Sequence, residues 1–319
     1  MTKDIGLGII GIAAGADVMA LNSDPTSRLK LSALCDPNAR AARALAERFE
    51  IPFVTTDPID LVSHAGIDAV AICGSVEERF GHCMAALSAG KRVLCGVPMA
   101  STVEQARELA AEADRFGGSL MVANPYRWQR EMAAIRGLAA AGELGEITFV
   151  QTEVSVGAAS GKAGAWELAT SVDLLRWTGG EIVSVCARSA DSAITAHVQF
   201  ANGGIGLAVI VRVPDGLASE GMTLNVVGTE GAVLNGRIAL NRLKGLPAMT
   251  FAAESAGSGD LLGSVREFEA SLTAAESAPW DAWDGVRLVA VCAAIDESFR
   301  TGLPAAVTES AAKGEAQHE

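Results

Sequence analysis

The stretch Ile5-Gly-Leu-Gly-Ile-Ile-Gly-Ile-Ala-Ala-Gly-Ala16 decides the fold that we expect, because an apolar run is followed directly by a turn of small residues. In nucleotide-binding α/β domains the first strand ends in such a turn. Glycine there permits a tight bend and a close approach to a phosphate at a helix N-terminus. Gly11 supplies the first glycine, Ala13 replaces the second, and Ala16 is an accepted variant of the third. Gly15 can relieve the strain by shifting the turn, so the motif is present in a weak form.

Asp36 strengthens the prediction of a nucleotide site. It follows the second apolar run, residues 29–35, about 20 residues after the turn, where dinucleotide-binding domains carry an acidic residue. A carboxylate at that point accepts a hydrogen bond from a ribose 2′-hydroxyl and repels a 2′-phosphate, so it favours NAD over NADP. The alternative is that Asp36 only begins a turn with Pro37.

The rest of the N-terminal part alternates short apolar runs with helical segments. After residues 5–12 and 29–35, apolar runs follow at 68–73, 92–95 and 119–123, and helices are expected at 16–21, 39–49, 78–89 and 103–116. Asn38 can cap the second of these helices, and Gly90 can end the third. Short buried strands that alternate with helices indicate a parallel sheet covered on both faces. We therefore expect a doubly wound Rossmann domain over residues 1–122.

The second part of the chain has a different pattern of expected helices and strands. After a helix expected at 128–141, longer alternating strands are expected at 147–156, 182–187, 194–200, 204–213 and 223–228. Asn202-Gly203 favours a hairpin turn between two of them. Together with a last helix at 285–300, this pattern predicts an α+β domain with a large, mostly antiparallel open sheet over residues 123–307. Residues 308–319 form a polar tail.

Composition excludes several classes of protein. Half of the 319 residues are hydrophobic, the net charge is −13, and no basic stripe offsets it, so we expect no nucleic-acid partner. The apolar runs are too short to cross a bilayer, and the N-terminus carries no signal peptide. Six cysteines without a CxxC pair and four histidines without metal-ligand spacing predict reduced thiols and no metal site. We expect a cytoplasmic protein that binds no membrane.

Further segments carry a resemblance to a known family. They follow one another in the family's order and span about residues 5–305: Ala33-Leu-Cys-Asp-Pro37, Ala89-Gly-Lys-Arg-Val-Leu-Cys95, Gly142-Glu-Leu-Gly-Glu-Ile147, Val172-Asp-Leu-Leu-Arg-Trp177, Val227-Gly-Thr-Glu-Gly231 and Asp284-Gly-Val-Arg287. In this the chain resembles the glucose-fructose oxidoreductase / inositol dehydrogenase (Gfo/Idh/MocA) family. The resemblance implies a Rossmann domain and an open-sheet domain, a ligand cleft between them, and homo-oligomers formed through the open sheet. It also implies NAD and a small-molecule ligand. The expected cofactor-binding residues are Gly11, Ala13, Ala14, Gly15, Asp36, Cys73, Gly74, Val97 and Pro98.

The chain departs from the family's pattern at its catalytic positions. The family's Glu-Lys-Pro signature, whose lysine assists proton transfer, falls on Gly96-Val97-Pro98, and valine carries neither charge nor hydrogen-bond donor. The family's acid/base histidine is missing between Thr170 and Ser171. A third signature, a histidine after the third strand, falls on Arg79. General acid–base assistance is typically worth about 10² to 10⁴ in rate, so the usual mechanism is not supported.

Other side chains are candidates to replace the missing groups. Tyr126, Glu167, Asp173 and Lys162 are the catalytic candidates: a phenol that can donate to an oxyanion, two carboxylates near the family's site, and a loop amine. Each also has a structural interpretation: a packing aromatic, an acid at a helix N-terminus, a helix anchor and a solvated lysine. The expected substrate-binding residues are Arg79, Asn124, Arg127, Trp166 and Thr170.

Three hypotheses about function remain open at the level of sequence. The first is a divergent enzyme acting on a sugar, cyclitol or related natural product, either as an NAD-dependent oxidoreductase with a relocated acid/base or as a non-redox catalyst. The second is a pseudoenzyme that serves as a ligand sensor or partner subunit. The third is an ordinary NAD(P)-dependent dehydrogenase, which fold analogy alone favours.

Overall fold

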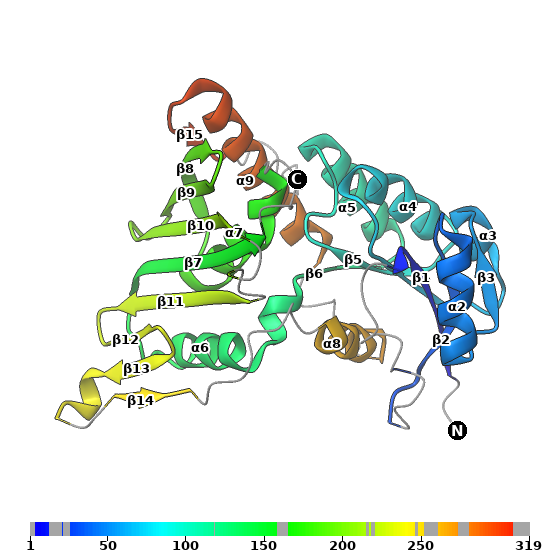
Figure 1. Cartoon of the computed structure of the whole chain (residues 1–319), viewed down its shortest axis with the longest axis horizontal. Coiled ribbons are helices and arrows are strands. Elements are labelled where there is room, and N and C mark those ends of the chain that lie inside the picture. Colours follow the sequence, from blue (N-terminus) through cyan, green and yellow to red (C-terminus); the bar gives the residue numbers. More distant parts are fainter. Residues whose placement is uncertain are drawn as a thin grey trace, which may run out of the picture. The chain divides into compact units, whose positions relative to one another are not determined.

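The computed structural model describes residues 4–12, 21, 26–117, 119–157, 165–214, 217, 221–245, 248–251, 261–273 and 281–308. The chain divides into two compact units, drawn in Figure 1. The N-terminal unit contains Met1–Asn124 and Leu261–Val289, and the C-terminal unit contains Pro125–Asp260 and Ala290–Glu309.

The N-terminal unit is built on a six-stranded sheet in the order β3-β2-β1-β4-β5-β6, in which every neighbouring pair is parallel. The strands are β1 (Ile5–Ile10), β2 (Leu29–Cys35), β3 (Phe53–Thr55), β4 (Ala69–Ile72), β5 (Arg92–Gly96) and β6 (Leu120–Ala123). All residues of β4 and β6 are buried, as expected for strands that helices cover on both faces. The doubly wound parallel sheet predicted from the sequence is confirmed.

Helices cover both faces of this sheet. They are α2 (Ala39–Phe49), α3 (Pro58–Ser63), α4 (Val76–Ser88), α5 (Val103–Arg115) and α8 (Leu261–Thr273). Phe268 of α8 packs in one cluster with Leu7 and Ile9 of β1. Gly8 lies between those two strand residues and faces the other side, where a Cβ on it would come within 2.7 Å of the Leu61 side chain of α3.

Two elements late in the chain complete the N-terminal unit. The Ser27 hydroxyl donates to Glu269 of α8 at 2.9 Å, and the Trp283 indole at the start of α9 (Ala282–Thr301) donates to Asp114 at 3.0 Å. The first part of α9 also packs closely, since a Cβ on Gly285 would come within 2.6 Å of the Met99 sulfur. The unit is therefore discontinuous in sequence, whereas the division expected from the sequence puts all residues after 122 elsewhere.

The C-terminal unit contains a nine-stranded sheet in the order β14-β13-β12-β11-β7-β10-β9-β8-β15. Its strands are β7 (Ile147–Gly157), β8 (Ile182–Ala190), β9 (Ala193–Phe200), β10 (Ile205–Val213), β11 (Met222–Gly228), β12 (Gly231–Leu234), β13 (Arg237–Leu240), β14 (Met249–Thr250) and β15 (Ala305–Ala306). Strands β7 and β10 pair in parallel, and the other described pairs are antiparallel. The predicted α+β architecture with a mostly antiparallel sheet is confirmed.

One face of this sheet packs against α7 (Ala165–Gly179), which contacts β7, β9 and β10. The packing is tight: a Cβ on Gly206 would come within 2.7 Å of Val198 and 3.3 Å of Leu175. The Ser298 hydroxyl of α9 accepts the backbone N–H of Ala187, so α9 is tied to β8 on the same sheet. The unit also contains α6 (Arg130–Ala140) and two 3₁₀ helices, η3 (Pro125–Trp128) and η4 (Asn241–Leu243).

Several local predictions are corrected. The helix expected at 128–141 begins at Arg130, because the residues after Pro125 form the 3₁₀ turn η3. The short elements β3, α3, β12, β13 and β14 and the helix α8 were not expected. The Asn38 cap is confirmed, since its side chain accepts the Ala41 N–H. Within the described ranges, no helix is long and apolar enough to cross a membrane.

Candidate functional site

A ligand-binding site is expected at the carboxyl edge of the parallel sheet. Doubly wound folds bind ligands at this edge, where the strand order reverses. The reversal lies between β1 and β4, which are neighbours in space but not in sequence. Gly11 follows β1 at this edge, and Cys73 and Gly74 follow β4. Asp36 follows β2, and the Gly96-Val97-Pro98 segment ends β5.

Gly11 brings the backbones after β1 and β4 into close approach. Its φ angle is +90°, which side-chain-bearing residues rarely adopt, and a Cβ on it would lie 2.8 Å from the Gly74 nitrogen. Its N–H donates to the Cys35 carbonyl at 2.9 Å. Glycine is therefore required here for two reasons, conformation and space.

The Asp36 carboxylate is held against the turn that follows β1. One oxygen accepts the Ile12 N–H at 3.0 Å, and the other accepts the Asn38 N–H at 2.8 Å. Both bonds are to backbone donors, and each carboxylate oxygen keeps a further lone pair for a hydroxyl group. The turn residues Ala13, Ala14 and Gly15 lie outside the described residues, so their predicted contacts are not placed.

Arg79, which was expected to bind substrate, lies at the same edge and joins two loops. Its Nε donates to the Gly74 carbonyl at 3.1 Å, and its Nη1 donates to the carbonyls of Gly96 at 3.2 Å and Pro98 at 2.6 Å. The guanidinium thus bonds to the residues on both sides of Val97. This clamp could not be predicted from the residue types, because its acceptors are backbone carbonyls.

The predicted cofactor residues Val97, Pro98 and Cys73 contribute no charged group to the edge. The Val97 N–H donates to the Ala123 carbonyl at 3.1 Å, which pairs the end of β5 with β6. Burial and the neighbouring Cys95 raise the pKa of the Cys73 thiol to about 12, so it is protonated at neutral pH. Asn124, which follows β6, is buried.

In the C-terminal unit, Arg127 of η3 and Asp173 of α7 form a buried ion pair. The Arg127 Nε donates to one Asp173 oxygen at 2.9 Å and its Nη2 donates to the other, while their side chains are 4% and 2% exposed. The Arg127 guanidinium also lies 5.8 Å from the centre of the Trp177 ring, and that of Arg136 lies 6.0 Å from it. The sequence left two interpretations of Asp173 open, a catalytic group and a helix anchor. This ion pair is the contact that a helix anchor would make.

Tyr126 and Glu167 belong to the same unit and differ in environment. Burial raises the pKa of the Tyr126 phenol, so it remains protonated at neutral pH and can donate a hydrogen bond. Glu167, in the first turn of α7, pairs with Arg212 of β10 at 3.2 Å. Burial raises the pKa of Glu167, and the positive charge of Arg212 opposes that rise.

The remaining candidates are placed only in part. Lys162 lies outside the described residues, and of Trp166 only the backbone is described, in the first turn of α7. Thr170 follows on the same helix and is half-buried. Among the described residues, no group of three or more histidine, cysteine, aspartate or glutamate side chains could hold a metal ion.

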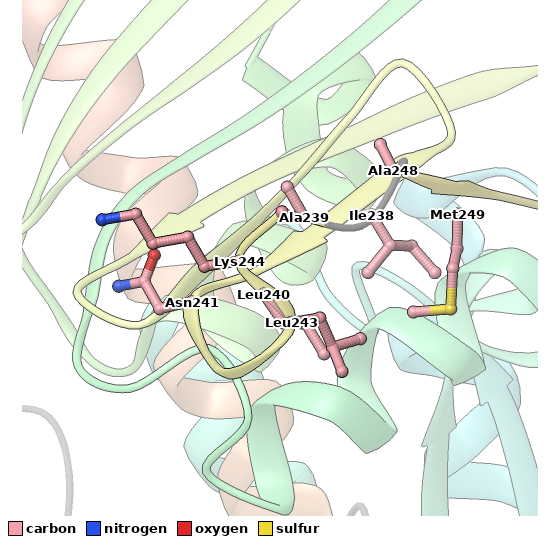
Figure 2. A pocket seen from close by; sticks show the side chains of 9 residues that line it. Ile238, Ala239, Leu240, Asn241, Leu243, Lys244, Ala248 and Met249 are labelled. Carbon is pink, nitrogen blue, oxygen red and sulfur yellow. The ribbon is translucent and has the colours of Figure 1, made fainter.

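A hollow of about 580 Å³ lies at the β13–β14 end of the nine-stranded sheet. Figure 2 shows its apolar side chains, among them Ile238, Leu243 and Met249, with the polar ends of Asn241 and Lys244 at one side. None of the site residues predicted from the sequence lines it. With a single cation and no carboxylate among its lining residues, it offers no acid/base pair.

The fold of the N-terminal unit and the geometry of Gly11 and Asp36 at its carboxyl edge are those of a doubly wound α/β protein of the nucleotide-binding class. Residues 5–124 match the model of an oxidoreductase family with an NAD-binding Rossmann fold, Gfo/Idh/MocA. D-Glucoside 3-dehydrogenase of Escherichia coli is 33% identical over 147 residues, which are 46% of this chain and 42% of that protein. Inositol 2-dehydrogenase of Mycolicibacterium gilvum is 28% identical over 94% of this chain and 93% of its own length. These matches support the Gfo/Idh/MocA family for this chain, and the family model itself covers residues 5–124.

The alignments differ in how much of each protein they cover. D-Glucoside 3-dehydrogenase and two further relatives, 27–35% identical, are covered over only 29–42% of their own lengths. Among solved structures, a levoglucosan dehydrogenase in complex with NADH and levoglucosan superposes with a TM-score of 0.84, covering 96% of this chain and all of the other. That structure is 18% identical in sequence, so the likeness shows the fold.

Proposed function

We propose that this protein is an NAD-dependent oxidoreductase that acts on a sugar or cyclitol hydroxyl group. The observation that carries the proposal is the carboxyl edge itself, where Gly11 meets the β4 backbone and the Asp36 carboxylate is fixed against the turn after β1. The names of the relatives support the substrate class, since they are dehydrogenases of glucosides and inositol.

The described residues fit a nicotinamide dinucleotide. A carboxylate at the end of β2 suits ribose hydroxyls and opposes a 2′-phosphate, and Gly11 keeps the edge free of a side chain at the strand reversal. When bound, the nicotinamide exchanges a hydride with the substrate carbon. The protein's own task is then to hold the substrate and to take up or deliver the hydroxyl proton.

We further propose that this proton moves through groups other than the lysine and histidine of the family's pattern. Val97 has no ionisable group, so the candidates are the Tyr126 phenol and the Glu167 carboxylate. A pKa raised by burial keeps Tyr126 a donor at neutral pH and makes Glu167 a stronger base than an ordinary carboxylate.

The first experiment is a calorimetric titration of the purified protein with NAD⁺, NADH, NADP⁺ and NADPH. We expect micromolar binding of NAD⁺ and NADH, and binding of the two phosphorylated forms at least roughly tenfold weaker because of Asp36. Failure to bind any of the four would overturn the proposal and leave a ligand-sensing or partner role, as in a pseudoenzyme.

A second experiment assigns the proton-transfer group once a substrate that the protein turns over has been found. Tyr126→Phe or Glu167→Gln should lower kcat by about 10² or more while NADH affinity stays the same. Glu181→Gln is the matched control, because Glu181 is also a half-exposed acid paired with an arginine, Arg176 at 3.0 Å. Full activity in both test variants would exclude a role for these two residues.

A further inference from the structure

Arg79 is a cation at the ligand-binding edge of the parallel sheet, and none of the described carboxylates forms an ion pair with it. The acceptors of its three described hydrogen bonds are neutral backbone carbonyls, so no described carboxylate is bonded to the guanidinium. The side chain is half-buried in a protein whose net charge is −13. An isolated guanidinium in such a place attracts an anion more strongly than a solvated one.

The guanidinium packs directly against Gly96. A Cβ on Gly96 would lie 3.5 Å from Nη2 and 3.7 Å from the central carbon of the guanidinium. Gly96, Val97 and Arg79 are all positions where the chain departs from the pattern of the family that it resembles, and they lie together. Arg79 therefore lies in van der Waals reach of position 96 and bonds to the carbonyls on both sides of Val97.

The orientation of the guanidinium leaves donors available. Nε and Nη1 bond to the loops after β4 and β5, whereas Nη2 makes no hydrogen bond to a described residue. Two bonded edges fix the plane of the group, so the N–H groups of Nη2 are held in place without a partner from the described chain. Fixed donors of this kind bind a carboxylate with little loss of side-chain entropy.

We propose that Arg79 replaces the lysine missing at position 97 as the cation of this site, and that it binds the carboxylate of an anionic, hydroxylated substrate. Within the proposed class of hydroxylated substrates, this favours compounds that also carry a carboxylate, such as sugar acids and other hydroxy acids. The inference deepens the proposed function and depends on it. Because arginine stays protonated, it positions the substrate and does not act as the base.

The test compares L-tartrate with L-threitol, which carries hydroxymethyl groups in place of the two carboxylates. Both are titrated calorimetrically into the protein with and without saturating NADH. We expect wild-type protein to bind tartrate at least tenfold more tightly than threitol, and Arg79→Met to lose roughly 10- to 100-fold of that preference. Arg79→Lys keeps the charge and should keep most of the preference.

Arg92→Met is the control, since Arg92 is an exposed cation at the opposite end of β5, and it should leave the preference unchanged. A merely structural role for Arg79 would weaken tartrate and threitol alike and lower the unfolding midpoint, so the ratio of the two affinities separates the cases. Wild-type protein that binds NADH without preferring tartrate overturns the inference. So does an Arg79→Met variant that keeps the preference, or an Arg79→Lys variant that loses it as fully. Failure to bind NADH at all would instead count against the proposed function.

Discussion

At the scale of single residues, two glycines show how differently one residue type can be used. Gly11 has a φ of +90° and backbone atoms within 3 Å of the position of a Cβ. Gly81 lies inside α4 and would have nothing within 4 Å of its Cβ. The first glycine is needed by the fold and the second is not.

Gly11→Ala should therefore lower the free energy of unfolding by about 1–3 kcal/mol through strain, and should abolish measurable NADH binding. Gly81→Ala should be neutral or stabilise the protein by about 0.5–1 kcal/mol, because alanine loses less conformational entropy in a helix. Urea unfolding followed by circular dichroism measures both. Equal effects of the two substitutions would contradict this account.

The sequence predicted some single residues of the site and not others, for a physical reason. Gly11 and Asp36 follow strands at fixed offsets, so local spacing identifies them. The Arg79 clamp depends on carbonyls 17 and 19 residues further on, and the Arg127–Asp173 pair spans 46 residues. Backbone carbonyls leave no mark in a sequence, and the pairing of distant charges follows only from the folded chain.

At the scale of elements, the ion pair of Arg127 and Asp173 joins η3 to α7 with both side chains nearly fully buried. Removing one partner of a buried pair leaves a charge without compensation, which is far more costly than losing an exposed pair. The pair of Arg176 and Glu181 provides the comparison, because the Glu181 side chain is 48% exposed.

Arg127→Met and Asp173→Asn should each lower the free energy of unfolding by about 3–5 kcal/mol, and the double variant by clearly less than the sum. Glu181→Gln should cost no more than about 1 kcal/mol. A double-mutant cycle from urea unfolding gives the coupling. Additive effects of Arg127→Met and Asp173→Asn would show that the two groups do not depend on each other.

The elements that the sequence predicted are the long ones with a clear period, such as α2, whose bounds match the expectation, and β10, which begins one residue later than expected. Short elements were missed, because three residues of β3 or two of β14 carry too little pattern to identify. The position of α8 in the N-terminal unit could not be predicted, since nothing local in its sequence says which sheet it covers.

At the scale of the whole molecule, the pattern of β10 leads us to propose that the chain forms a homo-oligomer. Ala208 and Ile210 are buried, and the alternating residues Leu207, Val209 and Val211 on the other face are also apolar. In Figure 1 the helices labelled α7 and α9 lie on one side of this sheet. A strand that is apolar on both faces is typical of a sheet covered on both sides. We expect a second copy of the chain to supply the cover.

If β10 lies in the proposed interface, Val209→Asp should dissociate the homo-oligomer and leave the circular dichroism spectrum unchanged, because each copy would bury a carboxylate there. Sedimentation velocity measures the change. Ile59→Asp is the control, since Ile59 is 55% exposed on α3 of the N-terminal unit and should leave the assembly as it is. A wild-type monomer would refute this expectation directly.

The discontinuity of the N-terminal unit has a consequence for how the protein is made. Val265 and Phe268 of α8 belong to the same apolar cluster as Leu7 and Leu31, yet they leave the ribosome only after the whole segment Pro125–Asp260 has been synthesised. At typical rates of translation, that interval lasts roughly ten seconds. During that interval the apolar face of the six-stranded sheet that α8 later covers is exposed on the nascent chain. We therefore expect ribosome-associated chaperones to bind this part of the chain while it is being synthesised.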